Sequence, residues 1–194
     1  MARIIAAFLL LFAAPSSAVA QTPGADNAEM TEIFAADQDI RREVSAIMET
    51  RKPAQELLVR MWKEDGARRT RTGELLSSGA LTTGNDFYHA AFIYQHGGTA
   101  GDYLLAHTLA VAAAARGHDK APWIAAATLD RYLQEIGQPQ IYGTQTSIPE
   151  GQKPTMEPYD RALVPDSLRV IMGVPVLEAQ ELRLKERQQK RSGD

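Results

Sequence analysis

The stretch from Thr99 to Gly137, TAGDYLLAHTLAVAAAARGHDKAPWIAAATLDRYLQEIG, determines the fold class of this 194-residue chain. Thr99 can cap a helix that ends at Gly117, and Asp119 can cap a second helix that ends at Gly137. Both segments are rich in alanine, which lets helix backbones approach one another closely. We therefore predict two antiparallel helices that pack as neighbours through a short turn.

Apolar residues recur at three- and four-residue steps in two segments further upstream. The first predicts an amphipathic helix over residues 30–50. The second predicts a helix over residues 53–66, which Gly66 stops. Residues 67–83 are ambiguous. The basic run ARRTR at 67–71 is more typical of a solvated loop or helix end than of a phosphate site.

One more helix is predicted between these segments, because Asn85 can cap DFYHAAFIYQH and two glycines, Gly97 and Gly98, mark its end. Strand patterns are nearly absent. The chain is therefore predicted to be all-α, with five to seven helices in antiparallel hairpins. This arrangement loosely resembles tetratricopeptide or Sel1-type repeats, although no repeat period holds along the chain.

A long proline-rich segment follows the predicted helix pair. Residues 138–165 include five prolines and show no periodicity. Such a long loop is uncommon in a compact domain unless it is functional or disordered, and its apolar and aromatic residues can pin it down. We predict an ordered loop that crosses the helices. Asp166 can then cap a short helix that Gly173 breaks, and a polar helix from about Val176 finishes the chain.

The N-terminus has the pattern of a secretory signal peptide. Arg3 precedes the apolar run IIAAFLLLFAA, and AVA at residues 18–20 is a small-residue cleavage site. The apolar run is too short to span a bilayer as a helix. We predict a signal peptide at residues 1–20, a mature chain that begins at Gln21, and a periplasmic or secreted protein. No stable membrane insertion is expected after cleavage.

The mature chain is predicted to form one domain. We expect a flexible leader at residues 21–28, a helical domain at 29–180, and a polar, frayed tail at 181–194. A domain of this length can bury a substantial core. The chain contains no cysteine, so the exported protein is predicted to fold without disulfides.

Composition argues against several kinds of partner. The net charge of −3 at pH 7 argues against a general nucleic-acid-binding protein, which needs a basic face. No cysteine or close carboxylate pair completes a metal site around the histidines. We predict neither a metal nor a cofactor. The expected partner is a polar ligand or an envelope protein.

Candidate functional side chains lie on two of the predicted helices. His96 falls in a last helical turn and shares a helix side with His89, although both can be packing residues that backbone carbonyls satisfy. Asp130 projects at the margin of an apolar sector, where a buried carboxylate must be paired. Arg131 lies further round the helix, where pairing with Glu135 on the surface is the simpler reading.

The loop that begins QPQIYGTQ is the third candidate. Gln140 and Gln145 bring amides, Tyr142 and Thr144 bring hydroxyls, and Gly143 permits a tight turn. These groups suit a neutral polar ligand, such as a sugar or peptide. They equally suit a loop that satisfies its own backbone. The bend at Pro139 predicts that the loop returns over the helix that carries Asp130 and Arg131, with His96 within reach.

The motif QPQIYGTQ resembles the signature of an uncharacterised bacterial family, a domain of unknown function with Q-x-Y-G-T-Q after an Asp-Arg helix. AADQDIRREV, AFIYQHGG and DSLRVIMGVPVL resemble other elements of that family, so the resemblance spans residues 34–177. HGG departs from the family's His-Ser/Ala-Asp type triplet, which puts a simple His–Asp dyad in doubt. The resemblance implies one constellation that consists of Asp37, Arg41, Gln95, His96, Asp130, Arg131, Gln140, Tyr142, Gly143, Thr144, Gln145 and Arg169.

Two functions are compatible with these residues. We favour a non-catalytic ligand- or protein-binding module in which the polar groups are buried as a structural lock. The alternative is a hydrolase acting on a polar cell-envelope or extracellular substrate. In it His96 is the general acid or base, Asp130 orients it, and Arg131 stabilises negative charge. The remaining nine residues of the constellation would bind the ligand. A structural role predicts that Asp130→Ala costs on the order of 1–3 kcal/mol, and a ligand site predicts little loss.

Overall fold

The computed structural model describes residues 24–48 and 53–190, and this part of the chain is all-helical. The fold class, with its helical hairpins, is thereby confirmed. The predicted signal peptide lies outside the described residues. The helices are α1 (Ala28–Met48), α2 (Gln55–Ser77), α3 (Gly84–Tyr94), α4 (Ala100–Ala115), α5 (Ala121–Glu135), α6 (Asp166–Ile171) and α7 (Leu177–Lys190).

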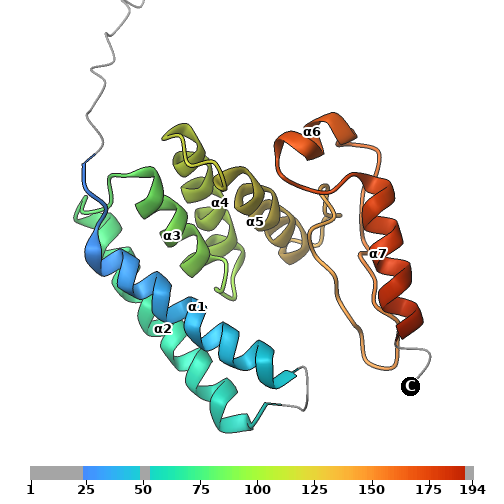
Figure 1. The fold of residues 1–194 in the computed structure, drawn as a ribbon, viewed down its shortest axis with the longest axis horizontal. Coiled ribbons are helices and arrows are strands. Elements are labelled where there is room, and N and C mark those ends of the chain that lie inside the picture. The colour runs from blue at the N-terminus through green and yellow to red at the C-terminus, as the bar shows by residue number, and fades with distance from the viewer. Residues whose placement is uncertain (1–23, 49–52, 191–194) are drawn as a thin grey trace, which may run out of the picture.

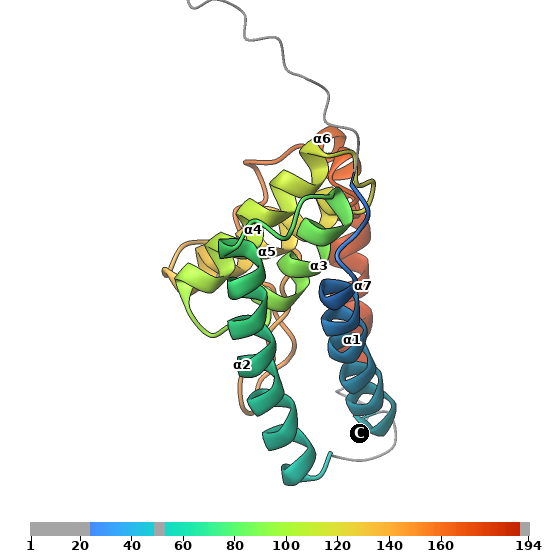
Figure 2. The same cartoon turned by 90° about the vertical axis from the view of Figure 1, so that its left-hand side faces the viewer.

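The helices form three groups along the long axis of the molecule. Figure 1 shows the antiparallel pair α1 and α2 at one end, α3 to α5 in the middle, and α6 and α7 at the other end. The quarter-turned view in Figure 2 shows α1 and α2 extending past the central helices. The main hydrophobic core joins the first two groups and consists of Met30, Leu75, Leu81, Ala90, Ala91, Ile93, Leu109, Ala110, Ile124 and Ala125.

Small side chains explain how tightly the central helices pack. α4 buries Ala106, Ala110 and Ala113 at three- and four-residue steps, and α5 buries alanines at 121 and 125–127. Methyl groups at a helix contact allow the two axes to approach closely. The alanine pattern that predicted the α4–α5 hairpin is therefore the pattern that forms its interface.

Helix α2 corrects the prediction for residues 53–83. Gly66 does not stop it, and ARRTR lies inside the helix rather than in a loop. A glycine in a helix interior costs about 1 kcal/mol relative to alanine. Here the burial of Arg68, Thr72 and Leu75 beyond the glycine outweighs that cost. A basic run that looked solvated is thus partly buried.

Helix caps follow the prediction at one of three sites in the central helices. Thr99 caps α4 by accepting from the Asp102 amide, as predicted. The cap of α3 is Thr83 rather than Asn85, because Thr83 and Asp86 form a reciprocal capping box. The N-cap position of α5 is Lys120 rather than Asp119, and it makes no side-chain cap bond.

Both ends of the described chain are held more firmly than predicted. In the leader, the Asn27 amide donates to Asp86 at 2.7 Å, and Asp26 accepts from the Thr83 hydroxyl at 2.7 Å. At the other end, α7 continues to Lys190, through most of the segment predicted to be a frayed tail. Its Gln188 donates to the Pro154 carbonyl at 2.8 Å.

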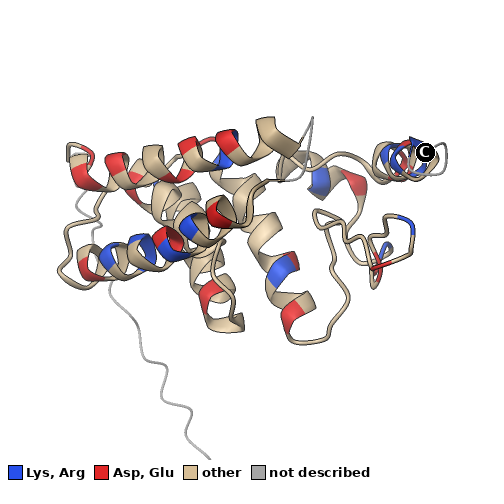
Figure 3. Ribbon diagram, turned by 90° about the horizontal axis from the view of Figure 1, so that it is seen from below, with Lys and Arg blue, Asp and Glu red and all other residues tan. Residues whose placement is uncertain are grey.

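Charge is distributed unevenly over the helices. Acidic and basic residues follow one another along α1 and α2, whereas α3 to α5 carry few charges (Figure 3). Among the described residues, no helix is both long and apolar enough to cross a membrane.

Candidate functional site

The structure divides eleven of the twelve residues of the predicted constellation between two groups, and Gln95 lies at the edge of the second, beside His96. One group, here called the loop anchor, consists of Asp130, Gln140, Tyr142, Gly143, Thr144, Gln145, Arg169 and Gln180. The other, here called the arginine cluster, consists of Asp37, Arg41, Asp65, Arg68, Arg69, His96 and Arg131. Consecutive residues of α5, Asp130 and Arg131, belong to different groups because side chains one residue apart on a helix point about 100° apart.

Asp130 is the centre of the loop anchor. It is fully buried, and its carboxylate accepts from the amides of Ile141, Tyr142 and Thr144 at 2.8, 3.0 and 2.9 Å. The Thr144 hydroxyl donates a fourth bond at 2.8 Å. These four bonds satisfy the buried charge. Asp130 therefore holds the loop on α5, where the prediction placed it, whereas His96, which was expected within reach of the loop, contacts Asp37, Gln95 and Arg69 instead.

The two glutamines of the motif also help to attach the loop to α5. Gln140 is fully buried; its amide donates to the Gln145 carbonyl at 3.0 Å and to the Met156 carbonyl, and its oxygen accepts from the Gln145 amide at 3.0 Å. The Gln145 side chain donates to the Ala127 carbonyl of α5 at 3.2 Å. Both side chains bond to backbone, as structural residues do.

Gly143 and Tyr142 contribute mainly through their backbone. Gly143 has φ +73°, and a Cβ there would lie 2.7 Å from the Tyr159 ring and against Gln180. The Tyr142 carbonyl accepts from the fully buried Arg169 at 2.7 Å and from Gln180 at 2.8 Å. The hydrogen bonds of the Q-x-Y-G-T-Q motif therefore join α5, the loop, α6 and α7.

The arginine cluster lies where α1, α2 and the end of α3 meet. Arg41 bridges two carboxylates, Asp37 at 3.1 Å and Asp65 at 3.0 Å, and Arg68 contacts Asp65 at 2.9 Å. Asp37 has 1% of its surface exposed and Asp65 has 6%. Burial raises the pKa of Asp37, and its neighbours Arg41, Gln38 and Arg68 oppose that rise. The bridging arginines thus keep two buried carboxylates in place.

His96 borders this network at the end of α3. Its Nε2 lies 3.6 Å from Asp37 Oδ2 and 3.4 Å from the amide of Gln95, while its carbonyl accepts from Arg69 at 3.0 Å. Burial, together with the charges of Arg41, Arg131, Arg68 and Arg69, lowers the pKa of His96 to about 2. The imidazole is therefore neutral at any ordinary working pH.

Arg131 reaches the cluster from α5 and forms no ion pair with the described carboxylates. Its one partner is the hydroxyl of Tyr103, and burial is the main cause of its lowered pKa. Its buried Nε has no hydrogen-bond acceptor in the described part of the chain, and the same holds for the Nε atoms of Arg41 and Arg68. Each buried donor without a partner costs about 1–3 kcal/mol. The cluster therefore contains donors that the fold itself leaves unused.

The charge balance of the cluster is positive. Four arginines (41, 68, 69 and 131) face two aspartates, Asp37 and Asp65, and Glu64 at the rim contacts Arg68 at 3.3 Å. Four positive and three negative charges leave an excess of one, with His96 neutral. An anion at such a site would accept hydrogen bonds from the donors that have no partner in the fold.

Sequence reasoning missed Asp65, Arg68 and Arg69 because it ended a helix at Gly66. A signal was present in the spacing of residues 65, 68, 72 and 75, which continues one helix side through the glycine and is buried in the structure. His96 lies just beyond the end of α3 rather than in its last turn, and His89, which is on α3, is a packing residue with its ring stacked 4.1 Å from Phe34.

The lowered pKa of His96 predicts a specific loss of stability in acid. The unfolded histidine takes up a proton below about pH 6.5, whereas the folded one stays neutral to about pH 2, so stability is present above 6.5 and falls as pH decreases. Between pH 7.5 and 5, wild type should lose about 2 kcal/mol more than His96→Gln, at about 1.4 kcal/mol per pH unit below 6.5. Urea unfolding at several pH values measures this, and parallel curves for the two proteins would contradict it.

Comparison with known proteins adds no relative. No family model, no curated protein and no solved structure matches the chain.

Proposed function

We propose that this protein is an exported, non-catalytic binding module that takes a small anionic ligand at the arginine cluster. The observation that carries the proposal is Arg131, a half-buried arginine that has no carboxylate partner among the described residues and whose buried Nε–H has no acceptor there. A buried donor without a partner costs about 1–3 kcal/mol. An anion bound beside Arg131 and Arg41 would remove that cost.

The module would present a preformed site. Asp37 and Asp65 orient the guanidinium groups of Arg41 and Arg68, so a ligand would meet donors that are already fixed. Gln95 and His96 would add neutral hydrogen-bonding groups at the edge. The loop anchor would serve the fold only, because its polar atoms are bonded to one another and to backbone.

The hydrolase considered from the sequence receives less support. A general acid or base works best when its pKa lies near the operating pH. The pKa of His96, at about 2, makes it a weak base, and Asp130 belongs to the other group of residues and orients the loop instead.

Histidine NMR tests the proposal with inorganic phosphate as the probe. Because the pKa of His96 is about 2, its ring stays neutral at pH 7, and an anion bound beside it should shift its NMR signals saturably at constant pH as phosphate is added. Arg131→Gln should abolish the phosphate effect with little loss of stability. Arg42→Gln, at an exposed arginine that pairs with Asp39, is the matched control and should keep the effect.

Two results would overturn the proposal. One is an unchanged His96 signal and an unchanged thermal midpoint up to about 10 mM phosphate, ten times a millimolar Kd. The other is a phosphate response that Arg131→Gln leaves intact.

A further inference from the structure

A cavity lies between the loop and α7, with Trp123 of α5 at its edge. It has a volume of about 250 Å³, and eleven residues line it, none of them acidic. That volume is slightly below the range of about 300–1,000 Å³ that holds drug-sized ligands. The cavity therefore suits a small molecule.

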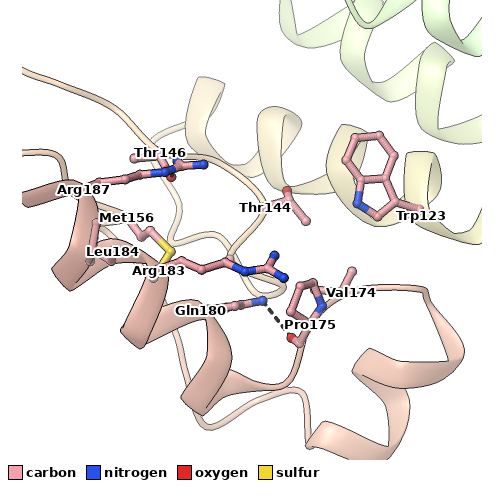
Figure 4. A pocket seen from close by; sticks show the side chains of 11 residues that line it. Trp123, Thr144, Thr146, Met156, Val174, Pro175, Gln180, Arg183, Leu184 and Arg187 are labelled. Carbon is pink, nitrogen blue, oxygen red and sulfur yellow. Dashed lines mark hydrogen bonds between the residues drawn. The ribbon is translucent and has the colours of Figure 1, made fainter. Parts of the chain in front are cut away.

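Two arginines of α7 point into this cavity. Figure 4 shows the side chain of Arg183 reaching toward Thr144 and Pro175, and that of Arg187 reaching toward Thr146. Arg187 makes a single long contact, 3.4 Å to the Thr146 hydroxyl, and Arg183 pairs with no described group. Like charges four residues apart on a helix repel each other by a few tenths of a kcal/mol. Among the described residues, no carboxylate forms an ion pair with either arginine.

The other walls of the cavity supply apolar contacts. Met156 and Val174 are buried, Leu184 is partly buried, and Trp123 stands at the edge with 43% of its surface exposed. The polar side chains of Thr144 and Gln180 are already bonded to Asp130 and to the Tyr142 carbonyl. The polar groups of the cavity that remain available to a ligand are therefore the two arginines, and the remaining walls are apolar.

We propose that this cavity binds a small amphiphilic anion, whose acidic head group is held by Arg183 and Arg187 and whose short apolar tail packs on Met156, Leu184 and Trp123. Guanidinium groups match the geometry of carboxylates and of phosphates with paired hydrogen bonds. The head group is therefore a carboxylate or a phosphate ester. This site is separate from the one in the proposed function and shares none of its residues.

Trp123 provides a local reporter. The chain has two tryptophans, and Trp62 lies on α2, so Trp62→Phe leaves Trp123 as the single tryptophan, which is excited selectively over the tyrosines at long wavelength. In this background, hexanoate and hexyl phosphate are titrated separately at constant ionic strength, with 1-hexanol as the neutral analogue of the same tail. Saturable changes in emission are expected with at least one anion, and the tighter of the two identifies the head group. 1-Hexanol should give none.

The charge requirement is tested on α7 itself. Arg183→Ala combined with Arg187→Ala should weaken binding at least tenfold, whereas Lys190→Ala, on the same helix but outside the cavity, should leave it unchanged. Neither change should affect the response of His96 to phosphate, so the two proposals fail independently. The inference is overturned if neither anion saturates by about 10 mM. Equal binding of 1-hexanol, or full affinity in the double variant, would also overturn it.

Discussion

Replacing Asp130 by alanine is expected to lower the free energy of unfolding by about 3–4 kcal/mol. The change removes four hydrogen bonds at once and leaves three backbone amides and one hydroxyl without their acceptor. A buried donor left unpaired costs about 1–3 kcal/mol, and the loop can recover part of this loss by moving into water. The total should therefore exceed that of a single bond and fall short of the full sum. Urea unfolding measures it.

Two matched variants define what the loss means. Glu135→Ala changes an exposed carboxylate on the same helix and should cost less than about 0.5 kcal/mol. Asp130→Asn keeps one acceptor oxygen and should fall between the two. Hydrogen exchange at the amides of Ile141, Tyr142 and Thr144 should quicken in Asp130→Ala. A loss below about 1 kcal/mol would contradict the anchoring role of Asp130.

Replacing Gly143 by alanine should destabilise the protein by about 3 kcal/mol for two additive reasons. The residue has φ +73°, a conformation that costs an L-residue about 1–2 kcal/mol. In addition, the new Cβ would lie 2.7 Å from the Tyr159 ring and against Gln180, which forces the loop away from α7 at a further 1–3 kcal/mol. Thermal and urea unfolding both report the sum.

Gly137→Ala separates the cost of the backbone conformation from the cost of the steric contact. Gly137 has the same φ of +73°, but no atom lies within 4 Å of the position that its Cβ would take. This variant should therefore cost only the backbone part, about 1–2 kcal/mol. Equal losses at the two glycines would mean that the contact with Tyr159 and Gln180 contributes nothing to the lock.

The stability of these variants distinguishes a structural role of the motif from a ligand-binding role. If both Asp130→Ala and Gly143→Ala are severely destabilised, the Q-x-Y-G-T-Q residues have a structural role. The arginine cluster and the α7 cavity are then the candidate ligand sites. Those two places share a property that the loop anchor lacks: cationic groups with unused donors.

Much of the fold can be predicted from the sequence because the relevant forces act within a few residues. Three- and four-residue spacing of apolar side chains predicts α1, and alanines between capping residues and glycines predict the α4–α5 hairpin. Glycine at 117 and 137 has positive φ at the ends of α4 and α5, as a helix terminator should. These elements need no distant partner to be recognised.

Tertiary structure decided the rest, since the outcome there depends on residues far apart in the sequence. Gly66 reads as a helix end on local propensity, yet α2 passes through it because Arg68, Thr72 and Leu75 become buried against distant helices. Likewise, Asp130 and Arg131 are consecutive in the sequence. The turn of α5 points one into the loop anchor and the other toward His96, 35 residues away along the chain from Arg131. Which polar group meets which is fixed by packing, and packing is a property of the whole chain.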